Sequence, residues 1–553
     1  MLGSQAIVKC LENEKVTTIF GYPGATVVPL YEALRNSDIN HILVRQEQAA
    51  GHAASGYARS LRTTGVCMAT SGPGATNLIT AIATAYMDSI PMVIITGQIE
   101  SNLIGKDIFQ EADVVGATSS FTKHNYLIND VKDIPRIFKE AFYIAGSGRK
   151  GPVLIDIPVD IQKQEIDFSY PLEVNIRGYK PTIEGHSVQI KRAINKISKS
   201  VKPLICVGGG IISANAEDEL KEFVGKSHIP VIHTLMAKDA LNSDSPYYMG
   251  MIGTHGAIQG NRAVKEADLV ILIGTRVADR ATGGSKFAKN ADIIHIDVDP
   301  AEIGKNLGTN IPLVGDSKCI LKKLNESISA LNTTEWLNEI NSYKSKNACA
   351  TDTCTTDACA ETGIGADTSS DTGFVNPKYA LKLLSKMVED DCIFTTDVGQ
   401  NQIWSAHNIS ITAERRFLTS GGLGTMGYSL PASIGAKIGN PSKRVVAVLG
   451  DGGFQMSLFE LGTIKANNLN IIILLFNNEV LGMVNEMQNK IYNASYGVSL
   501  SGNPDFIKLA DSYEIKGKKV FNNSELENAF NEALNCQGSF LIECAVSKDE
   551  STL

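Results

Sequence analysis

Short runs of apolar, often β-branched residues recur along this chain, and most of them end in glycine, aspartate or asparagine. Residues 445–449 and 471–476 are the clearest runs, and apolar positions at roughly helical spacing lie between them. Runs of this length and composition are typical of buried parallel strands, and an intervening helix makes a βαβ unit. The pattern therefore predicts an α/β fold of doubly wound parallel sheets.

The same alternation predicts three such domains in the 553 residues, a length that suggests about three or four. We expect domains at 1–165, 186–345 and 375–553, with a charged, proline-containing connection at about 163–185. Further strands are predicted at 41–45, 92–96, 203–207, 268–273 and 292–296.

Residues 346–374 lack apolar periodicity and are rich in Ala, Thr, Asp and Gly. Cys349, Cys354 and Cys359 recur there every five residues, but this is not a standard zinc spacing and the tract holds no histidine. The composition favours a low-complexity linker between the second and third domains.

Composition narrows the class of protein. Apolar residues make up 43% and charged residues 20%, which is typical of a globular protein, and the net charge is −8. Without a basic tract, nucleic acid and anionic membranes are poor partners. No apolar run approaches the roughly 18 residues of a membrane span, and the amphipathic N-terminus lacks a signal-peptide core. We expect a cytoplasmic protein.

Candidate chemistry lies at the carboxyl ends of the two clearest strands. Asp451, within Gly-Asp-Gly, follows the first strand, and Asn478 follows the second. Open α/β sheets bind ligands at this edge, and carboxylate, amide and carbonyl oxygens suit Mg²⁺. Glycines allow a close approach to phosphate at a helix N-terminus. The alternative is an ordinary turn in which Asp451 caps a helix.

Taken together, these residues resemble the signature of thiamin diphosphate (ThDP) enzymes. That resemblance makes Asp451, Asn478 and the main chain of Val480 the Mg²⁺ ligands. Motifs around Gly21, Glu47 and Asn77 are similar to the pyrimidine-binding domain of the family, where a glutamate activates the cofactor; we expect Glu47 in this role. The resemblance assigns the other cofactor contacts to Gly21, Pro23, Asn77, Val398, Gly399, Gln400, Gly424, Met426, Gly452, Gly453 and Met483.

Within that family, Phe109-Gln110 resembles the acetohydroxyacid synthase (acetolactate synthase) branch. The resemblance makes Phe109 and Gln110 part of the catalytic pocket and gives Arg280 the carboxylate of a second substrate; Phe109 as plain core is the alternative. It also implies FAD in the middle domain. The implied FAD contacts are Arg149, Gly208, Gly209, His255, Gly256, Arg276, Asp297 and Asp316.

The activity implied by the resemblance is acetolactate synthesis for branched-chain amino acids. Pyruvate is decarboxylated on ThDP, and the hydroxyethyl carbanion adds to a second 2-oxo acid. Met487 stands where the family places a tryptophan, so the choice between pyruvate and 2-oxobutyrate stays open. The resemblance implies a homodimer or homotetramer, with a small regulatory subunit possible. Alternatives are a flavin- and ThDP-dependent decarboxylase or oxidase, or a catalytically silent regulatory homologue.

Overall fold

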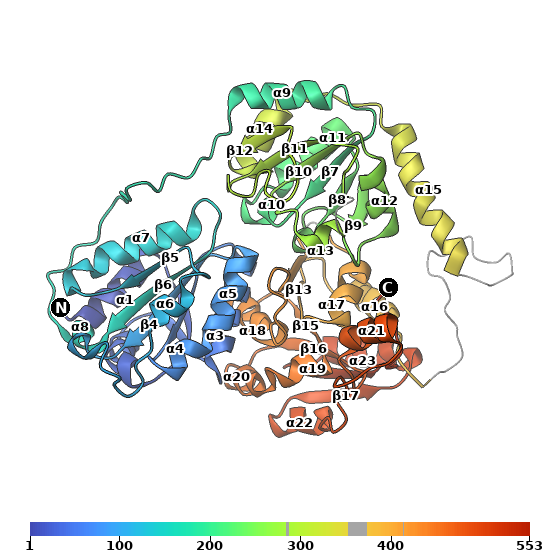
Figure 1. Cartoon of the computed structure of the whole chain (residues 1–553). Helices are drawn as coiled ribbons and strands as arrows, with labels where there is room; N and C mark the ends of the chain where they lie inside the picture. The colour runs from blue at the N-terminus through green and yellow to red at the C-terminus, as the bar shows by residue number, and fades with distance from the viewer. Residues whose placement is uncertain (284–286, 352–372, 413) are drawn as a thin grey trace.

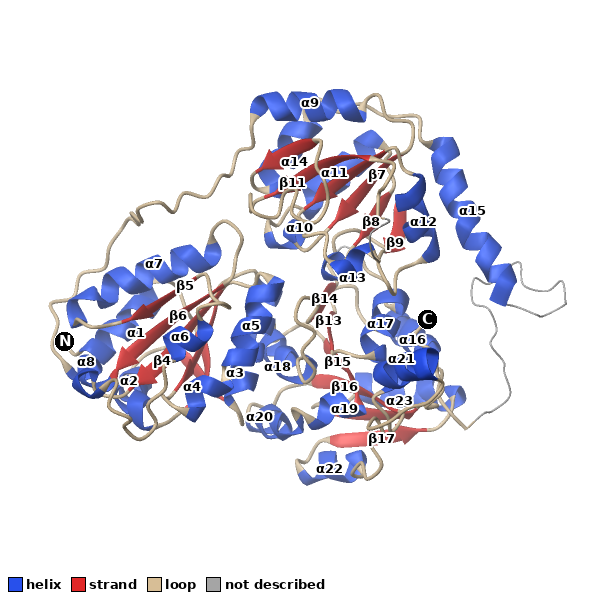
Figure 2. Cartoon of the chain, viewed as in Figure 1, coloured by secondary structure: helices blue, strands red, loops and turns tan. Residues whose placement is uncertain are grey.

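The computed structural model describes residues 1–283, 287–351, 373–412 and 414–553, with side chains of 344–351 left out. Within these ranges the chain forms three six-stranded sheets, in which every strand pair is parallel (Figure 2). Helices cover the sheets, so the predicted doubly wound α/β class is confirmed.

The first sheet has the order β2-β1-β3-β4-β6-β5. Its strands are β1 (Thr18–Tyr22), β2 (Asn40–Leu43), β3 (Gly65–Ala69), β4 (Met92–Gln98), β5 (His124–Leu127) and β6 (Pro152–Pro158). The helices are α1 (Gly3–Asn13), α2 (Val28–Arg35), α3 (Glu47–Leu61), α4 (Pro73–Asn77), α5 (Ile79–Asp88), α6 (Val114–Thr118), α7 (Ile134–Gly146) and α8 (Val159–Lys163).

The middle sheet has the order β12-β11-β10-β7-β8-β9. Its strands are β7 (Pro203–Val207), β8 (Val231–His233), β9 (Tyr248–Met251), β10 (Leu269–Ile273), β11 (Asp292–Asp297) and β12 (Ile311–Val314). The helices are α9 (Ser187–Ile197), α10 (Gly210–Ser213), α11 (Glu217–Ser227), α12 (Ile258–Glu266), α13 (Asp279–Thr282), α14 (Ser317–Asn325) and α15 (Thr334–Thr351).

The third sheet has the order β14-β13-β15-β16-β18-β17. Its strands are β13 (Ile393–Thr396), β14 (Arg416–Thr419), β15 (Val445–Gly450), β16 (Ile471–Asn477), β17 (Lys516–Val520) and β18 (Phe540–Ala545). The helices are α16 (Pro377–Met387), α17 (Gln400–Asn408), α18 (Ser429–Gly439), α19 (Asp451–Gln455), α20 (Leu461–Ala466), α21 (Gly482–Tyr492), α22 (Phe506–Ser512) and α23 (Leu526–Leu534).

The first and third domains meet along α3 and α18, whose backbones nearly touch (Figure 1). A Cβ on Gly56 would lie 2.0 Å from the carbonyl oxygen of Ala432, and one on Gly435 would lie 1.8 Å from that of Ala53. Small residues on both helices therefore permit this packing. The middle domain lies above both domains in Figure 1.

Two local expectations need correction. The helix expected between β15 and β16 is broken into α19, a 3-10 turn at Leu458–Glu460 and α20. Met456, one of the apolar positions whose spacing predicted that helix, is 54% exposed. Helix α15 extends through Thr351, so the first part of the tract predicted as linker is helical. The rest of that tract, including Cys354 and Cys359 but not residues 373–374, lies outside the described residues. No helix of the described ranges is long and apolar enough to cross a membrane.

Candidate active site

The turns after β15 and β16 come together at the carboxyl edge of the third sheet. Gly450 and Phe476 are paired in register, which brings Asp451 and Asn478 onto adjacent turns. An oxygen of Asp451 accepts hydrogen bonds from the Glu479 amide at 3.0 Å and from Asn503 Nδ2 at 2.7 Å. Asn478 Oδ1 accepts one from the Val480 amide at 3.3 Å. The three predicted metal ligands thus lie on one connected structure.

The electrostatics of Asp451 suit a cation. Its side chain is 2% exposed, and burial raises its pKa to about 6 although several N–H groups donate to it. A buried carboxylate whose ionisation is costly gains from a nearby positive charge. Carboxylate, amide and carbonyl oxygens together form the hard donor set that Mg²⁺ prefers. The residues therefore fit the metal.

Next to this turn, α17 and α21 begin at the same edge, and the first amides of a helix are free to bind a phosphate. Gly399 has φ of +142°, a conformation that favours glycine, directly before α17. Gln400, the first residue of α17, accepts a hydrogen bond from Asn478 Nδ2 at 3.1 Å. The predicted cofactor contacts Gly399 and Gln400 and the predicted metal ligands therefore lie together in one site, which we call the cradle.

Asp397, which the motifs did not single out, organises this cradle. Its carboxylate accepts hydrogen bonds from the amides of Val398, Gly427 and Ser429 at 2.9, 2.9 and 3.0 Å. A Cβ on Gly453 would lie 2.4 Å from its oxygen, so only glycine fits there. Asp397 thereby ties the β13 turn to the end of the segment that carries Gly424 and Met426.

The side of the cradle near Met426 is apolar. The Cε of Met426 would lie 3.3 Å from a Cβ on Gly452, and the side chain of Leu481 is nearby. Met483 lies two residues further on, in the first turn of α21. The structure thus brings both predicted methionines and the glycines of α19 to the same part of the domain.

Residues near the C-terminus also reach the cradle. Gln400 Nε2 donates to the Glu550 carbonyl at 2.8 Å and to Thr552 Oγ1 at 3.2 Å. The Thr552 amide donates to Glu486 of α21 at 3.0 Å. This segment therefore links α17 with α21, a contact that no motif indicated.

The Glu47 group lies on the first domain. Glu47 begins α3, and its Oε2 accepts a hydrogen bond from Asn77 Nδ2 at 3.0 Å. Gln110 packs against Gly72, where a Cβ would lie 2.9 Å from that of Gln110. Both residues have positive φ, +62° for Gln110 and +60° for Gly72. Positive φ is uncommon for a residue other than glycine, and such strain clusters at functional sites.

Much of this group is open to solvent in the single chain. Phe109 is 84% exposed, which excludes the core alternative in this chain, and Glu47 is only partly buried. Gly21 is buried against β3, where a Cβ would lie 2.7 Å from the Met68 carbonyl oxygen, whereas Pro23 is exposed. Among the described residues, no hydrogen bond joins Glu47, Asn77 or Gln110 to Asp451 or Asn478.

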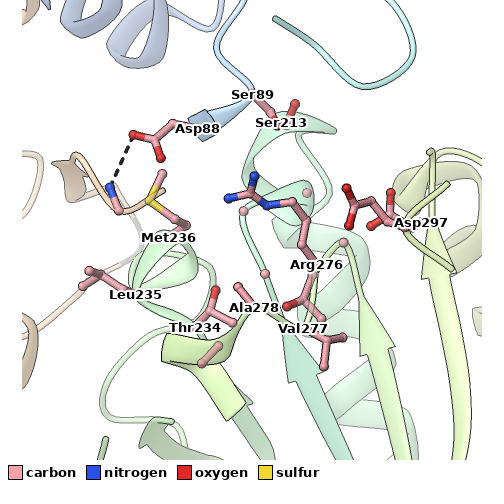
Figure 3. Close-up of a pocket in the computed structure, with 18 of the residues that line it drawn as sticks. Asp88, Ser89, Ser213, Thr234, Leu235, Met236, Arg276, Val277, Ala278 and Asp297 are labelled. Atoms are coloured by element: carbon pink, nitrogen blue, oxygen red, sulfur yellow. Dashed lines mark hydrogen bonds between the residues drawn. The ribbon is translucent and has the colours of Figure 1, made fainter. Parts of the chain in front are cut away.

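A second concave site, which we call the central cavity, lies where the three domains meet (Figure 3). Its volume is about 230 Å³, and its walls include Asp88 and Arg149 of the first domain, Arg276 of the middle domain and Gly421 of the third. Most residues predicted to contact FAD line it. These are Arg149, Gly208, Gly209, His255, Arg276, Asp297 and Asp316.

The charges in the central cavity fit an anionic ligand with hydroxyl groups. Burial and the neighbouring Arg149 lower the pKa of Arg276, so a phosphate would stabilise both guanidiniums. Arg149 donates to Glu302 at 2.8 Å. Burial raises the pKa of Asp297, at the end of β11, to about 6, and it can accept hydrogen bonds from a ligand. The residues therefore fit a dinucleotide such as FAD.

Other predicted flavin contacts also have structural tasks. Gly208 packs against the middle sheet, since a Cβ would lie 2.2 Å from the Gly274 carbonyl oxygen, and Asp316 caps α14. Gly256 is not among the described residues of the cavity wall. A Cβ added to Gly256 would overlap the backbone of Ile252, so the turn at this position requires glycine. Arg280, expected at the second substrate, lines the central cavity together with His255.

Comparisons with known proteins match this three-part architecture. The N-terminal TPP binding domain of thiamine pyrophosphate enzymes matches residues 1–117. The central domain of these enzymes matches residues 190–324, and the C-terminal TPP binding domain matches residues 397–544.

Similarity to individual proteins extends over nearly the whole chain. A probable acetolactate synthase large subunit of Methanococcus aeolicus is 44% identical over 99% of this chain and 92% of its own. One of Methanocaldococcus jannaschii is 43% identical over 100% and 93%. The acetolactate synthase large subunit of Haemophilus influenzae is 40% identical over 99% and 95%.

Proposed function

The chain belongs to the thiamine pyrophosphate enzyme family, among the acetolactate synthase large subunits, and from this premise we propose how its residues perform the reaction. As such a synthase it binds thiamin diphosphate and joins two 2-oxo acids with loss of CO₂. The observation that carries the assignment to a working enzyme is the turn pair at Asp451 and Asn478, which keeps an oxygen donor set beside a diphosphate cradle.

In the proposed cradle, Asp451, Asn478 and the Val480 carbonyl would hold Mg²⁺, which would neutralise charge on the cofactor diphosphate. Gln400 orients Asn478 by accepting its Nδ2–H, so that Oδ1 of the amide remains directed away from Gln400. When bound, the cofactor supplies the nucleophilic carbon and the electron sink for decarboxylation and carboligation.

Glu47 is the proposed acid-base residue of the cofactor site. Asn77 donates to one of its oxygens, so the carboxylate keeps a fixed orientation while the other oxygen can share a proton with the aminopyrimidine. Main-chain groups at Gly424 and Met426 are proposed to bind the opposite edge of that ring. Phe109 and Gln110 would enclose the reacting carbon, and Arg280 would pair with the carboxylate of the second substrate.

We propose that a second copy of the chain completes the site, as a homodimer or a homotetramer. Acid-base work by Glu47 needs a setting with little water, but the single chain leaves Glu47 partly exposed and Phe109 almost fully exposed. The cradle of another subunit would cover both. A small regulatory subunit is a further proposed partner, because the similar proteins are large subunits by name.

We further propose FAD for the central cavity, domain limits at 1–165, 186–345 and 375–553, and a place in the cytoplasm. The fit of Arg149, Arg276 and Asp297 to a dinucleotide supports the flavin. We propose that Met487, which is 47% exposed and stands at the position of the family's tryptophan, decides whether 2-oxobutyrate competes with pyruvate.

The proposal is tested by supplying the purified protein with ThDP, Mg²⁺, FAD and pyruvate, with and without oxygen, and measuring acetolactate, acetaldehyde and peroxide. We expect acetolactate as the main product and a loss of at least about 100-fold in Glu47→Gln. Glu222→Gln, on a solvent-exposed ion pair of α11, serves as the control. Acetaldehyde or peroxide as the main product would contradict carboligation in favour of the decarboxylase or oxidase.

A further inference from the structure

The segment 420–427, which carries Gly424 and Met426, is held from another domain by helix α5. Asp88, the last residue of α5, accepts hydrogen bonds from the Gly422 amide at 2.6 Å and from the Gly421 amide at 3.4 Å. One turn earlier in α5, the Thr84 hydroxyl bonds with that of Thr425 at 2.7 Å. The first domain thus grips this segment at two points.

The same carboxylate lies in the wall of the central cavity. Figure 3 shows Asp88 bonded to a main-chain amide on one side, with the guanidinium of Arg276 extending toward it from the other. Burial raises the pKa of Asp88, whereas the charges of Arg59 and Arg276 and the Gly422 amide lower it. Asp88 therefore interacts with a cation of the cavity and with the amides of the segment.

The segment is closely packed against the other two domains. A Cβ on Gly421 would lie 2.4 Å from Met236 Sδ, and one on Gly422 would lie 2.7 Å from the Met87 carbonyl oxygen. Met236 also lines the central cavity. Met87 of the first domain and Met236 of the middle domain therefore both pack against the segment.

We propose that Asp88 is a positioning residue that couples occupancy of the central cavity to the affinity of the 420–427 segment for thiamin diphosphate. This inference rests on the proposed cofactor sites. An anion in the cavity pairs with Arg276 and neutralises the positive charge that acts on Asp88 from the cavity side, so the carboxylate is left to the amides of Gly421 and Gly422. The segment is then held more firmly, and the cofactor that binds to it gains affinity.

The test compares ThDP affinity, measured by titration calorimetry in Mg²⁺, for flavin-free and FAD-loaded protein. In the wild type we expect FAD to tighten ThDP binding roughly ten-fold, within the usual range of coupling between sites. Asp88→Asn keeps the shape but removes the charge, and we expect it to reduce this factor to near one.

Thr84→Val is the matched control, because Thr84 grips the same segment but is not among the described residues of the cavity wall. We expect it to weaken ThDP binding equally with and without FAD, so that the factor stays near ten. A full coupling factor in Asp88→Asn, or no effect of bound FAD in the wild type, would overturn the inference.

Hydrogen exchange of the ligand-free protein gives a second measurement. The amides of Gly421 and Gly422 should exchange roughly ten-fold faster in Asp88→Asn than in the wild type, since a charge-assisted acceptor is lost. Unchanged exchange would refute the positioning role. If FAD fails to bind the wild type, the flavin proposal fails by itself, and the exchange rates still decide whether Asp88 holds the segment.

Discussion

At the scale of single residues, the site depends on carboxylates buried at the ends of strands. Asp397 and Asp451 follow β13 and β15, and burial raises the pKa of each to about 6. Neither is paired with a lysine or arginine at salt-bridge distance among the described residues. Main-chain amides donate to both carboxylates, and the Asn503 side chain also donates to Asp451. Their ionisation is therefore sensitive to whatever charge occupies the cradle.

Proton binding to Asp451 predicts how metal affinity depends on pH. Its folded-state pKa lies near 6, above the ordinary value of 3.8, so below pH 6 the carboxyl is mostly protonated and Mg²⁺ must displace the proton. We expect the apparent Mg²⁺ affinity, measured by titration in ThDP, to fall about ten-fold per pH unit below pH 6 and to be flat above pH 7. An equal affinity at pH 5 and pH 7 would contradict the assignment.

A raised carboxyl pKa also makes the stability of the metal-free protein depend on pH. Metal affinity falls as the pH is lowered, whereas the contribution of such a carboxyl to folding becomes more favourable. For Asp397, a folded pKa of about 6 against 3.8 means that the folded state binds the proton more tightly. Its contribution is most favourable below pH 3.8 and is lost as pH rises to 6. In Asp397→Asn this slope should be smaller, but one carboxylate oxygen that accepts from main-chain amides is replaced by an NH₂ group, which should destabilise the fold by about 1–3 kcal/mol. Urea unfolding at pH 5 and pH 7 measures both effects.

At the scale of elements, α3 and α18 form the closest contact between domains. Gly435→Ala would place a methyl group 1.8 Å from the Ala53 carbonyl oxygen. We expect a loss of about 1–3 kcal/mol or more in the free energy of unfolding, because neither backbone can move back without separating the helices.

Gly225→Ala is the control for that substitution. It lies within α11, and nothing is within 4 Å of its added Cβ. There the alanine should stabilise the protein by up to about 1 kcal/mol. Equal effects of the two substitutions on chemical denaturation would show that the packing of α3 on α18 is not tight.

The sequence predicted those elements that are determined by the pattern of neighbouring residues. Strands β15 and β16 follow from apolar runs, and the position of Asp451 and Asn478 follows from the end of each run. The break between α19 and α20 escaped prediction because Met456 fits the helical spacing but is exposed. Asp88 and Gly422 are 334 residues apart in the sequence, and no motif around either residue predicts their hydrogen bond.

At the scale of the whole molecule, a network of charges joins all three domains. Arg62 of the first domain donates to Glu217 of the middle domain, and Arg416 of the third lies 3.8 Å from the same carboxylate. Glu217 is 8% exposed, so both cations depend on a largely buried partner. This network lies at a junction that no single domain could form.

Glu217→Gln should loosen the attachment of the middle domain. Removing one member of a buried ion network commonly costs about 3–5 kcal/mol, because the remaining charges are left without compensation. We expect the thermal unfolding of the variant to separate into two transitions, with the middle domain melting first. Glu222→Gln, which affects an exposed pair on the same helix, should leave a single transition.

The helix seam between α3 and α18 also has a consequence for evolution. Gly56 and Gly435 leave no space for a side chain, because each lies against a backbone carbonyl of the other helix. A single substitution there destabilises the protein before a second substitution can compensate for it, so the sequences of both helices are constrained together. We expect this seam to diverge more slowly than the surface of the catalytic cradle, and lineages that acquire new substrates should still carry it.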